Sequence, residues 1–324
     1  MRGRAAAVVV GLALAVGGCA GTAPAGDGLT EPRRSSGSPE VHPSWESCGA
    51  ATSETEVYLS GSQEALLLPS LDEGFQPVAA VVCRVVPQRR PNGGEDLVAV
   101  EERADDVAAL VLSLRLPDQK STESACTLEL PFVPWLALLD AQGRWVRPGV
   151  PTDVCGKPRQ EFRTAYDQLP AERVTTRVLR EIESDEAVAS GCSQQWADMV
   201  WVTGQFGGGQ DTTPGVLPAD DADVRVCVYQ VPESEQGGGK PAGDFQSGGE
   251  LAAGKWTAVK RELTAAGPAA ACPTPASRFA VLHLPIGFVY VEADGCRRAL
   301  VEAGTGPSAL RQGTARLTSL LFDQ

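Results

Sequence analysis

The chain is poor in the residue types on which most enzyme and metal chemistry depends. Its 324 residues contain two histidines and nine cysteines, and no two cysteines are closer than 24 positions. Zinc sites and thiol–disulfide active sites use cysteine pairs a few residues apart, so this spacing disfavours both. No Gly-x-Ser-x-Gly sequence is present to expose a nucleophile, and a catalytic triad would have to use His283, because the other histidine, His42, lies in the predicted tether. We therefore predict that the protein is not an enzyme and that it uses no metal ion or cofactor.

Basic residues are also scarce. Lys and Arg number 28 against 41 Asp and Glu, which gives a net charge of −13. Binding to phosphates needs clustered cations, so we predict no nucleic-acid partner. The hydrophobic share of 43% and the charged share of 21% are ordinary, and they exclude a fibrous or wholly disordered chain.

No apolar run is long enough to span a membrane. The longest N-terminal run covers about twelve residues, 5–16, and follows Arg2 and Arg4. A positive start and a short apolar core are typical of a secretory signal peptide, which we place at residues 1–18.

The end of this segment, Val16-Gly17-Gly18-Cys19, resembles the lipobox of bacterial lipoproteins. The resemblance implies that Cys19 receives a diacylglyceryl group and becomes the first residue of the mature chain. Two acyl chains anchor a protein stably, so we predict attachment to the outer face of the cell membrane. Residues 20–44 are rich in Ala, Gly, Ser, Thr and Pro, and we interpret 19–44 as the lipidated cysteine with a flexible tether.

The other eight cysteines fall into two sets with matching intervals. The intervals are 35, 43 and 29 residues in the first set, and 35, 45 and 24 in the second. An even number in an exported chain predicts disulfides. The repeated spacing predicts that 45–188 and 189–324 are two copies of one module. The cysteines are Cys48, Cys83, Cys126, Cys155, Cys192, Cys227, Cys272 and Cys296.

Each copy is predicted to be an α+β module in which two helices accompany an antiparallel sheet. Apolar runs at 78–86 and 224–231 predict buried strands, and hairpins are expected at 132–150 and 278–291. The third and fourth cysteines of each set flank such a hairpin, whose ends lie close together. The natural disulfides are therefore Cys126–Cys155 and Cys272–Cys296, which leaves Cys48–Cys83 and Cys192–Cys227 as the other pairs.

Acidic residues are interpreted as structural rather than catalytic. Asp153 and Asp294 each precede a fourth cysteine and a predicted helix, so we expect them to cap helix N–H groups. Glu101 and Glu102 are adjacent, and adjacent acids more often line an exposed edge of a sheet. The run from Asp220 to Asp223 lacks the spacing of a calcium loop and is expected to form a solvated turn.

The sequence Gly191-Cys192-Ser193-Gln194-Gln195-Trp196 and the cysteine pattern are similar to those of uncharacterised lipoproteins of high-G+C Gram-positive bacteria. That resemblance implies no activity. We predict a non-catalytic, lipid-anchored protein outside the cytoplasm that binds an unknown envelope or secreted protein, a peptide or another envelope component. The alternatives are a ligand-binding accessory protein for transport and an unrecognised cell-wall hydrolase.

Overall fold

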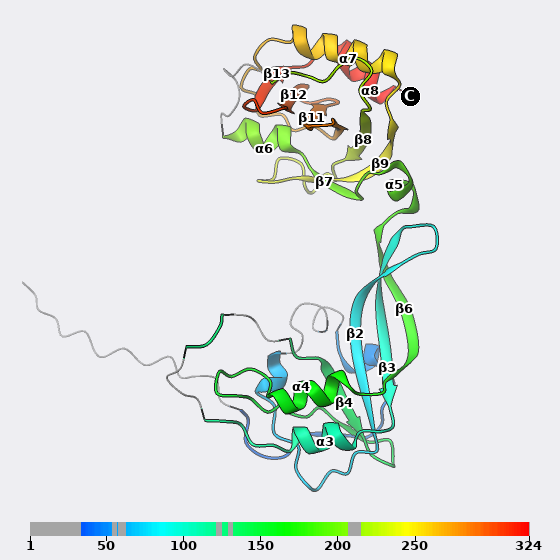
Figure 1. Ribbon diagram of the computed structural model, residues 1–324, viewed down its shortest axis with the longest axis vertical. Helices are drawn as coiled ribbons and strands as arrows, with labels where there is room; N and C mark the ends of the chain where they lie inside the picture. Colours follow the sequence, from blue (N-terminus) through cyan, green and yellow to red (C-terminus); the bar gives the residue numbers. More distant parts are fainter. Residues whose placement is uncertain are drawn as a thin grey trace, which may run out of the picture.

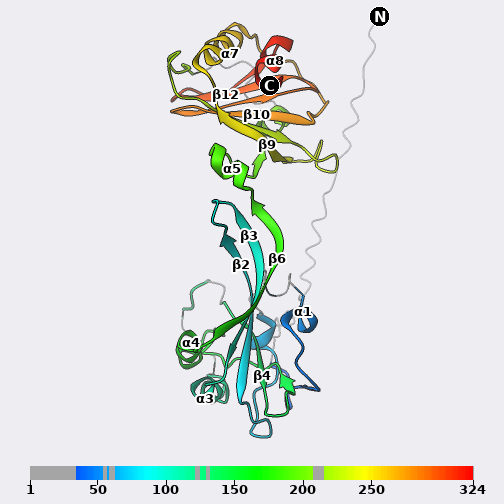
Figure 2. The same ribbon diagram turned by 90° about the vertical axis from the view of Figure 1, so that its right-hand side faces the viewer.

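The chain forms two lobes that lie end to end (Figures 1 and 2). The computed structural model describes residues 34–53, 57, 63–120, 125–128, 132–206 and 215–323. The predicted signal peptide, 1–18, and Cys19 lie outside the described residues. Each lobe is built around one antiparallel sheet, so the fold is mixed α/β with two sheets.

The first lobe contains a six-stranded sheet in the order β1-β5-β4-β2-β3-β6. Its strands are β1 (Val41–His42), β2 (Ala79–Arg89), β3 (Glu95–Ala104), β4 (Trp135–Leu139), β5 (Trp145–Val146) and β6 (Glu172–Glu183). Its helical segments are α1 (Cys48–Ala51), the 3-10 turn η1 (Gln63–Leu66), α3 (Ala108–Leu114) and α4 (Gln160–Asp167).

Strand β2 is apolar on both sides, and both faces of the sheet are covered there. Ala80 and Val82 face the core beneath α3 and α4, whereas Val81 and Cys83 face the N-terminal segment. The period of two along a strand sends neighbouring side chains to opposite faces, so a continuous apolar run suits a central strand.

The second lobe contains a seven-stranded sheet in the order β13-β12-β11-β10-β8-β9-β7. Its strands are β7 (Gln195–Ala197), β8 (Arg225–Gln230), β9 (Ala242–Glu250), β10 (Arg278–His283), β11 (Gly287–Glu292), β12 (Arg298–Ala303) and β13 (Ala309–Gln312). The helices α7 (Ala253–Ala265) and α8 (Ala315–Phe322) cover one face, and α6 (Met199–Gln205) covers the other.

The lobes are joined by β6 and the short helix α5 (Asp185–Ser190), beside the β2–β3 hairpin (Figure 1). Arg90, at the tip of that hairpin, forms ion pairs with Asp96, Glu181 and Asp185 at 2.7–3.1 Å. Gly93 adopts a φ of 106° in the turn, and a Cβ there would lie 3.0 Å from a Val188 methyl group. The hairpin tip is therefore fastened to the segment that leads into the second lobe.

Four disulfides join the pairs that the hairpin argument predicts, two in each lobe. They are Cys48–Cys83, Cys126–Cys155, Cys192–Cys227 and Cys272–Cys296. None of them connects the lobes, so each lobe is crosslinked only within itself. The predicted strands and hairpins are present as β2, β8, β4–β5 and β10–β11.

Three local predictions are wrong. The first residue after Cys296 to enter a regular element is Arg298, which begins strand β12 rather than a helix. Asp294 instead accepts hydrogen bonds from the Ser277 backbone N and hydroxyl, and Asp153 accepts them from the backbone N of Cys155 and Lys157. These carboxylates stabilise turns and cap no helix.

Residues 34–44, which the sequence assigns to the tether, are held against the first lobe. Arg34 pairs with Asp118 at 2.7 Å and donates to the carbonyls of Leu68 and Val150. Val41 and His42 form β1, which pairs with β5. The composition of 34–44 is typical of a linker, but a single arginine with three acceptors and one strand pair hold it against the lobe.

Candidate functional site

A pocket of about 270 Å³ lies on the face of the first sheet that the N-terminal segment covers. Val85 and Ala99, on β2 and β3, are part of its lining, with Thr175 and Arg177 of β6 beside them. Helix α1 closes one end, because the Cys48–Cys83 disulfide ties it to β2. The remaining described lining residues are Ser47, Cys48, Gly49, Thr52, Ser53, Val57, Cys83, Arg84, Val100 and Glu101.

Glu101 fixes the N-terminal segment over the pocket. Its carboxylate accepts hydrogen bonds from the Trp45 indole N–H at 3.2 Å and from the Cys48 backbone N at 2.8 Å. The residue is only 8% exposed, so the expectation of an exposed edge is wrong for it. A buried carboxylate with donors to both oxygens is stably held, which makes it a structural acceptor.

An aromatic cluster supports the same segment. The Trp45 ring lies edge-on to Trp145, with centroids 5.3 Å apart, and His42 stacks on Trp145 at 4.0 Å. Trp135 completes the cluster from β4 and is almost fully buried. His42 is thus a packed residue, and the Trp45–Glu101 hydrogen bond links this cluster to the pocket.

The two lobes differ in the side chains that follow Cys83 and Cys227 on the sheet. Val85 lies two residues after Cys83 and pairs with Ala99. Tyr229 lies two residues after Cys227 and pairs with Phe245, the two ring centroids being 6.3 Å apart. Small side chains therefore leave a cavity in the first lobe where large ones occupy the sheet face in the second.

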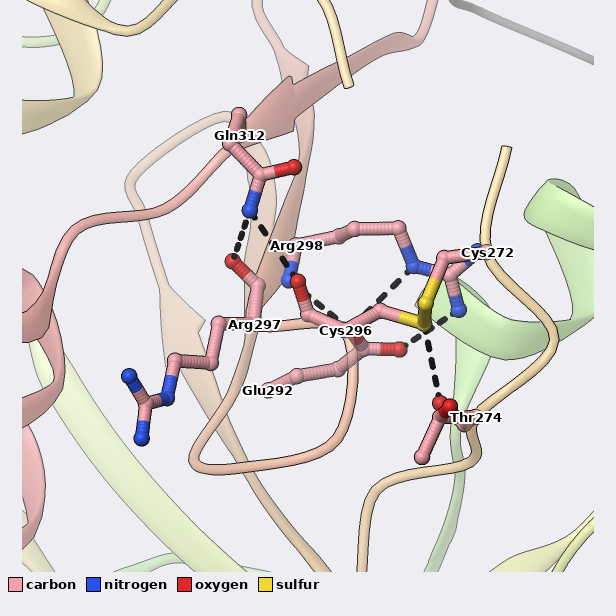
Figure 3. Close-up of a disulfide and its surroundings, with 7 residues drawn as sticks. All are labelled: Cys272, Thr274, Glu292, Cys296, Arg297, Arg298 and Gln312. Atoms are coloured by element: carbon pink, nitrogen blue, oxygen red, sulfur yellow. Dashed lines mark hydrogen bonds and ion pairs between the residues drawn. A yellow bond between two sulfur atoms is a disulfide. The ribbon is translucent and has the colours of Figure 1, made fainter. Parts of the chain in front are cut away.

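The second lobe buries an ionic cluster that the sequence did not reveal (Figure 3). Glu292 and Arg298 are 0% and 2% exposed, and the guanidinium donates to both carboxylate oxygens at 2.7 and 3.2 Å. The pair lies beside the Cys272–Cys296 disulfide. Burial raises the pKa of Glu292, and the hydrogen bonds from Arg298 act in the opposite direction.

Asp198 adds a second buried carboxylate to this cluster. It is 1% exposed and accepts a hydrogen bond from the Trp201 backbone N at 3.1 Å, which caps α6. Burial raises the pKa of Asp198 to about 7, and the charge of Glu292 adds to the effect. The Arg298 guanidinium lies 5.8 Å from the Trp201 ring centroid, so the cluster secures α6 against the sheet.

Within the described part of the chain, His283 forms no hydrogen bond or ion pair with a carboxylate that could orient it. Its ring contacts Trp196 and Phe288, with centroids 5.3 and 5.2 Å away. Burial lowers the pKa of His283, and the charge of Arg225 lowers it further. These surroundings describe a packed, neutral histidine.

A wider and shallower depression of about 810 Å³ runs between α3 and α4. Leu112, which is 70% exposed, and Ala109 line it together with Gln160 and Thr164. It contains no disulfide and is more open than the pocket under α1, so we regard the latter as the candidate functional site.

Three further expectations concern the acidic run that begins at Asp220, metal binding and membrane-spanning segments. Asp220 forms an ion pair with Lys260 at 2.8 Å in an exposed turn. Within the described ranges, no three His, Cys, Asp or Glu side chains are grouped so that they could hold a metal ion. No helix in those ranges is both long enough and apolar enough to cross a membrane.

No known family model matches the chain, and no curated protein or solved structure is significantly similar to it.

Proposed function

We propose that this protein is a lipid-anchored binding protein of the cell envelope, without catalytic activity of its own. The proposed anchor is Cys19, at the end of Val16-Gly17-Gly18-Cys19, after a short apolar segment. The pairing of the other eight cysteines supports export, because such disulfides persist in oxidising compartments.

The observation that carries the binding role is the pocket beneath α1. It combines an apolar floor, Val85 and Ala99, with the hydroxyls of Ser53 and Thr175 and the guanidinium of Arg177. Ligand sites in proteins have this composition: mostly apolar walls with a few polar groups that fix orientation. The volume suits one side chain or a similarly small apolar group.

The polar groups of the pocket favour recognition over catalysis. The only carboxylate in the described lining is Glu101, and both of its oxygens already accept hydrogen bonds from Trp45 and Cys48. A carboxylate that holds Trp45 and Cys48 in place serves as a structural acceptor, which is a poor arrangement for a general base. We infer a peptide or envelope component that places an apolar side chain on the floor and a carboxylate or carbonyl towards Arg177.

We further propose that the lobes are two copies of one module. The strand orders β5-β4-β2-β3 and β11-β10-β8-β9 correspond, and β2 and β8 each contain the second cysteine of a set. The helices α3 and α7 follow β3 and β9 in the two lobes. If this is correct, residues 189–324 produced alone in an oxidising compartment will fold with their two disulfides. An unfolded fragment would contradict the proposal.

The binding role is tested by filling the pocket. ¹⁵N-labelled protein is titrated with tripeptides that have a central Val, Leu or Phe, each as the free acid and as the C-terminal amide. We expect shifts of the Ser53, Ala99 and Thr175 amides, larger with the free acids. Ala99→Phe, which copies the aromatic filling of the second lobe, should abolish them.

The matched control is Ala109→Phe, in the depression between α3 and α4. It adds the same ring to the same lobe and should leave the shifts unchanged. The proposal fails if none of the peptides shifts these amides at millimolar concentration, or if Ala99→Phe leaves the shifts intact.

A further inference from the structure

Strand β6 ends the sheet of the first lobe and is exposed along most of its length. It is bonded to β3 on one side, and no described strand pairs with its other side. From Glu172 to Arg180, every residue except Leu179 is exposed. An open edge with unpaired backbone groups is a template for another strand.

Two features of this edge suit a partner strand. Val174 and Val178 are 55% and 59% exposed, which is high for β-branched apolar side chains four residues apart. Glu172 and Arg180, at the two ends of the exposed stretch, have no ion pair within the described part of the chain. Apolar surface in the middle and opposite charges at the ends together describe a surface that fits its own copy.

We propose that two copies of this chain associate by antiparallel pairing of their β6 strands, with Thr176 on the twofold axis. In this register, Val174 of each copy lies opposite the partner's Val178, and Glu172 lies opposite the partner's Arg180. Opposed β-branched pairs and opposite-charge pairs are the favourable cross-strand combinations. A twofold axis repeats every contact, so each favourable pair occurs twice.

Other registers fit less well. Pairing centred between two residues is not compatible with a twofold axis, because neighbouring side chains lie on opposite faces of the sheet. Centring the pairing on Arg177 places two guanidinium groups together on the axis. Centring it on Val178 requires Glu181, which already pairs with Arg90, and Ile182, which is partly covered near α5.

The regularity of the strand also points to Thr176. The β3–β6 ladder has irregularities near both ends, but it is continuous from Thr175 to Val178. Bulges hinder edge pairing, so the uninterrupted stretch forms the centre of the backbone pairing, and the contacts of Val174, Glu172 and Arg180 extend it beyond the irregularities. The axis therefore falls within it.

The same register brings the partner copy to the candidate site. Thr175 lines the pocket, and its opposite residue is the partner's Arg177. The dimer itself does not depend on the pocket having a ligand. Where the binding role also holds, a second guanidinium would stand near each pocket.

The test uses the full-length protein in an oxidising bacterial envelope. In Thr176→Cys the two copies would place identical residues directly opposite, about 4.5–5.5 Å apart between Cα atoms, within the range of a disulfide. Mild oxidation should therefore yield a species of twice the mass on non-reducing gels. The control Thr257→Cys, on an exposed site of α7, should not crosslink.

Charge reversal tests the register. Glu172→Arg should lower the Thr176→Cys crosslink several-fold, because it then faces the partner's Arg180, and adding Arg180→Glu should restore it. Sedimentation velocity of the detergent-extracted native chain should show a mass that rises with concentration. Equal crosslinking at Thr257→Cys, failure of the double reversal to rescue, or a monomer at all concentrations would each overturn the proposal.

Discussion

Replacing Asp198 by asparagine should remove a pH dependence from the stability of the second lobe. Asparagine caps helices as well as aspartate does, so the hydrogen bond from the Trp201 backbone N can be retained. What disappears is a buried carboxylate that faces Glu292 and Arg298. The variant therefore separates the capping role of this side chain from the cost of its charge.

The sign of the pH dependence follows from the number of protons that Asp198 binds in the folded and in the unfolded state. The folded pKa of Asp198 is about 7 against an ordinary value of 3.8, so the folded state holds a proton between these values that the unfolded state has lost. The stabilisation is complete below pH 3.8 and is lost as the pH rises towards 7. From pH 5 to pH 8 this amounts to about 2–3 kcal/mol, at about 1.4 kcal/mol per pKa unit. A fixed cost of burying the amide would not change with pH.

The pH dependence of stability is measured by urea unfolding at pH 5, 6, 7 and 8. Pulse hydrogen exchange of peptides from β10 to β12 reports the second lobe alone. The wild type should lose stability over this range, and Asp198→Asn should lose about 2–3 kcal/mol less. Asp221→Asn removes an exposed carboxylate from the same lobe and serves as the control. If the wild type and Asp198→Asn have parallel pH profiles, the carboxylate is not the buried proton-binding group described here.

The remaining predictions concern the anchor and the bonds that hold each lobe. Cys19→Ala should move the protein from the membrane fraction to the soluble fraction, as followed by immunoblotting of fractionated cells. Replacing both Cys48 and Cys83 by serine should cost about 3–4 kcal/mol in urea unfolding, from the loop entropy of a 35-residue closure. Asp294→Asn should cost about 1–3 kcal/mol through the weakened turn to Ser277, in the same assay. Arg90→Ala should speed hydrogen exchange in α5, and high salt should reproduce that effect in the wild type but add little to the variant.

The features predictable from sequence are those set by short-range patterning. The β4–β5 and β10–β11 hairpins follow from apolar runs on either side of a turn, and the disulfides flank them in the chain. Trp135, Trp201 and Trp256 lie in apolar stretches of the sequence and are buried in the structure. In each case the interacting residues are close in sequence or belong to one periodic element.

The buried charges were not predictable from the sequence, because tertiary contacts between separate elements bury them. Glu292 and Arg298 are six residues apart, but they meet because β11 and β12 are adjacent strands, and β12 was expected to be a helix. Glu101 is buried because the N-terminal segment, some fifty residues earlier, covers it. A charged side chain in a strand is usually exposed, and only its tertiary partners reveal the exception.

The sequence contains a weak signal of the pocket, which a comparison of the two halves could have detected. Two residues after the second cysteine, one half has Val85 and the other Tyr229, a large difference in volume at matched positions. The partner residues, Ala99 and Phe245, differ in the same direction, but β8 and β9 have a register shift beside Tyr229 that no spacing argument would supply. A loss of bulk on both strands at one point of a sheet leaves a cavity unless another segment fills it. In the first lobe α1 borders that cavity and does not fill it. The Cys48–Cys83 disulfide and the hydrogen bond from the Cys48 backbone N to Glu101 hold the helix at the edge of the cavity.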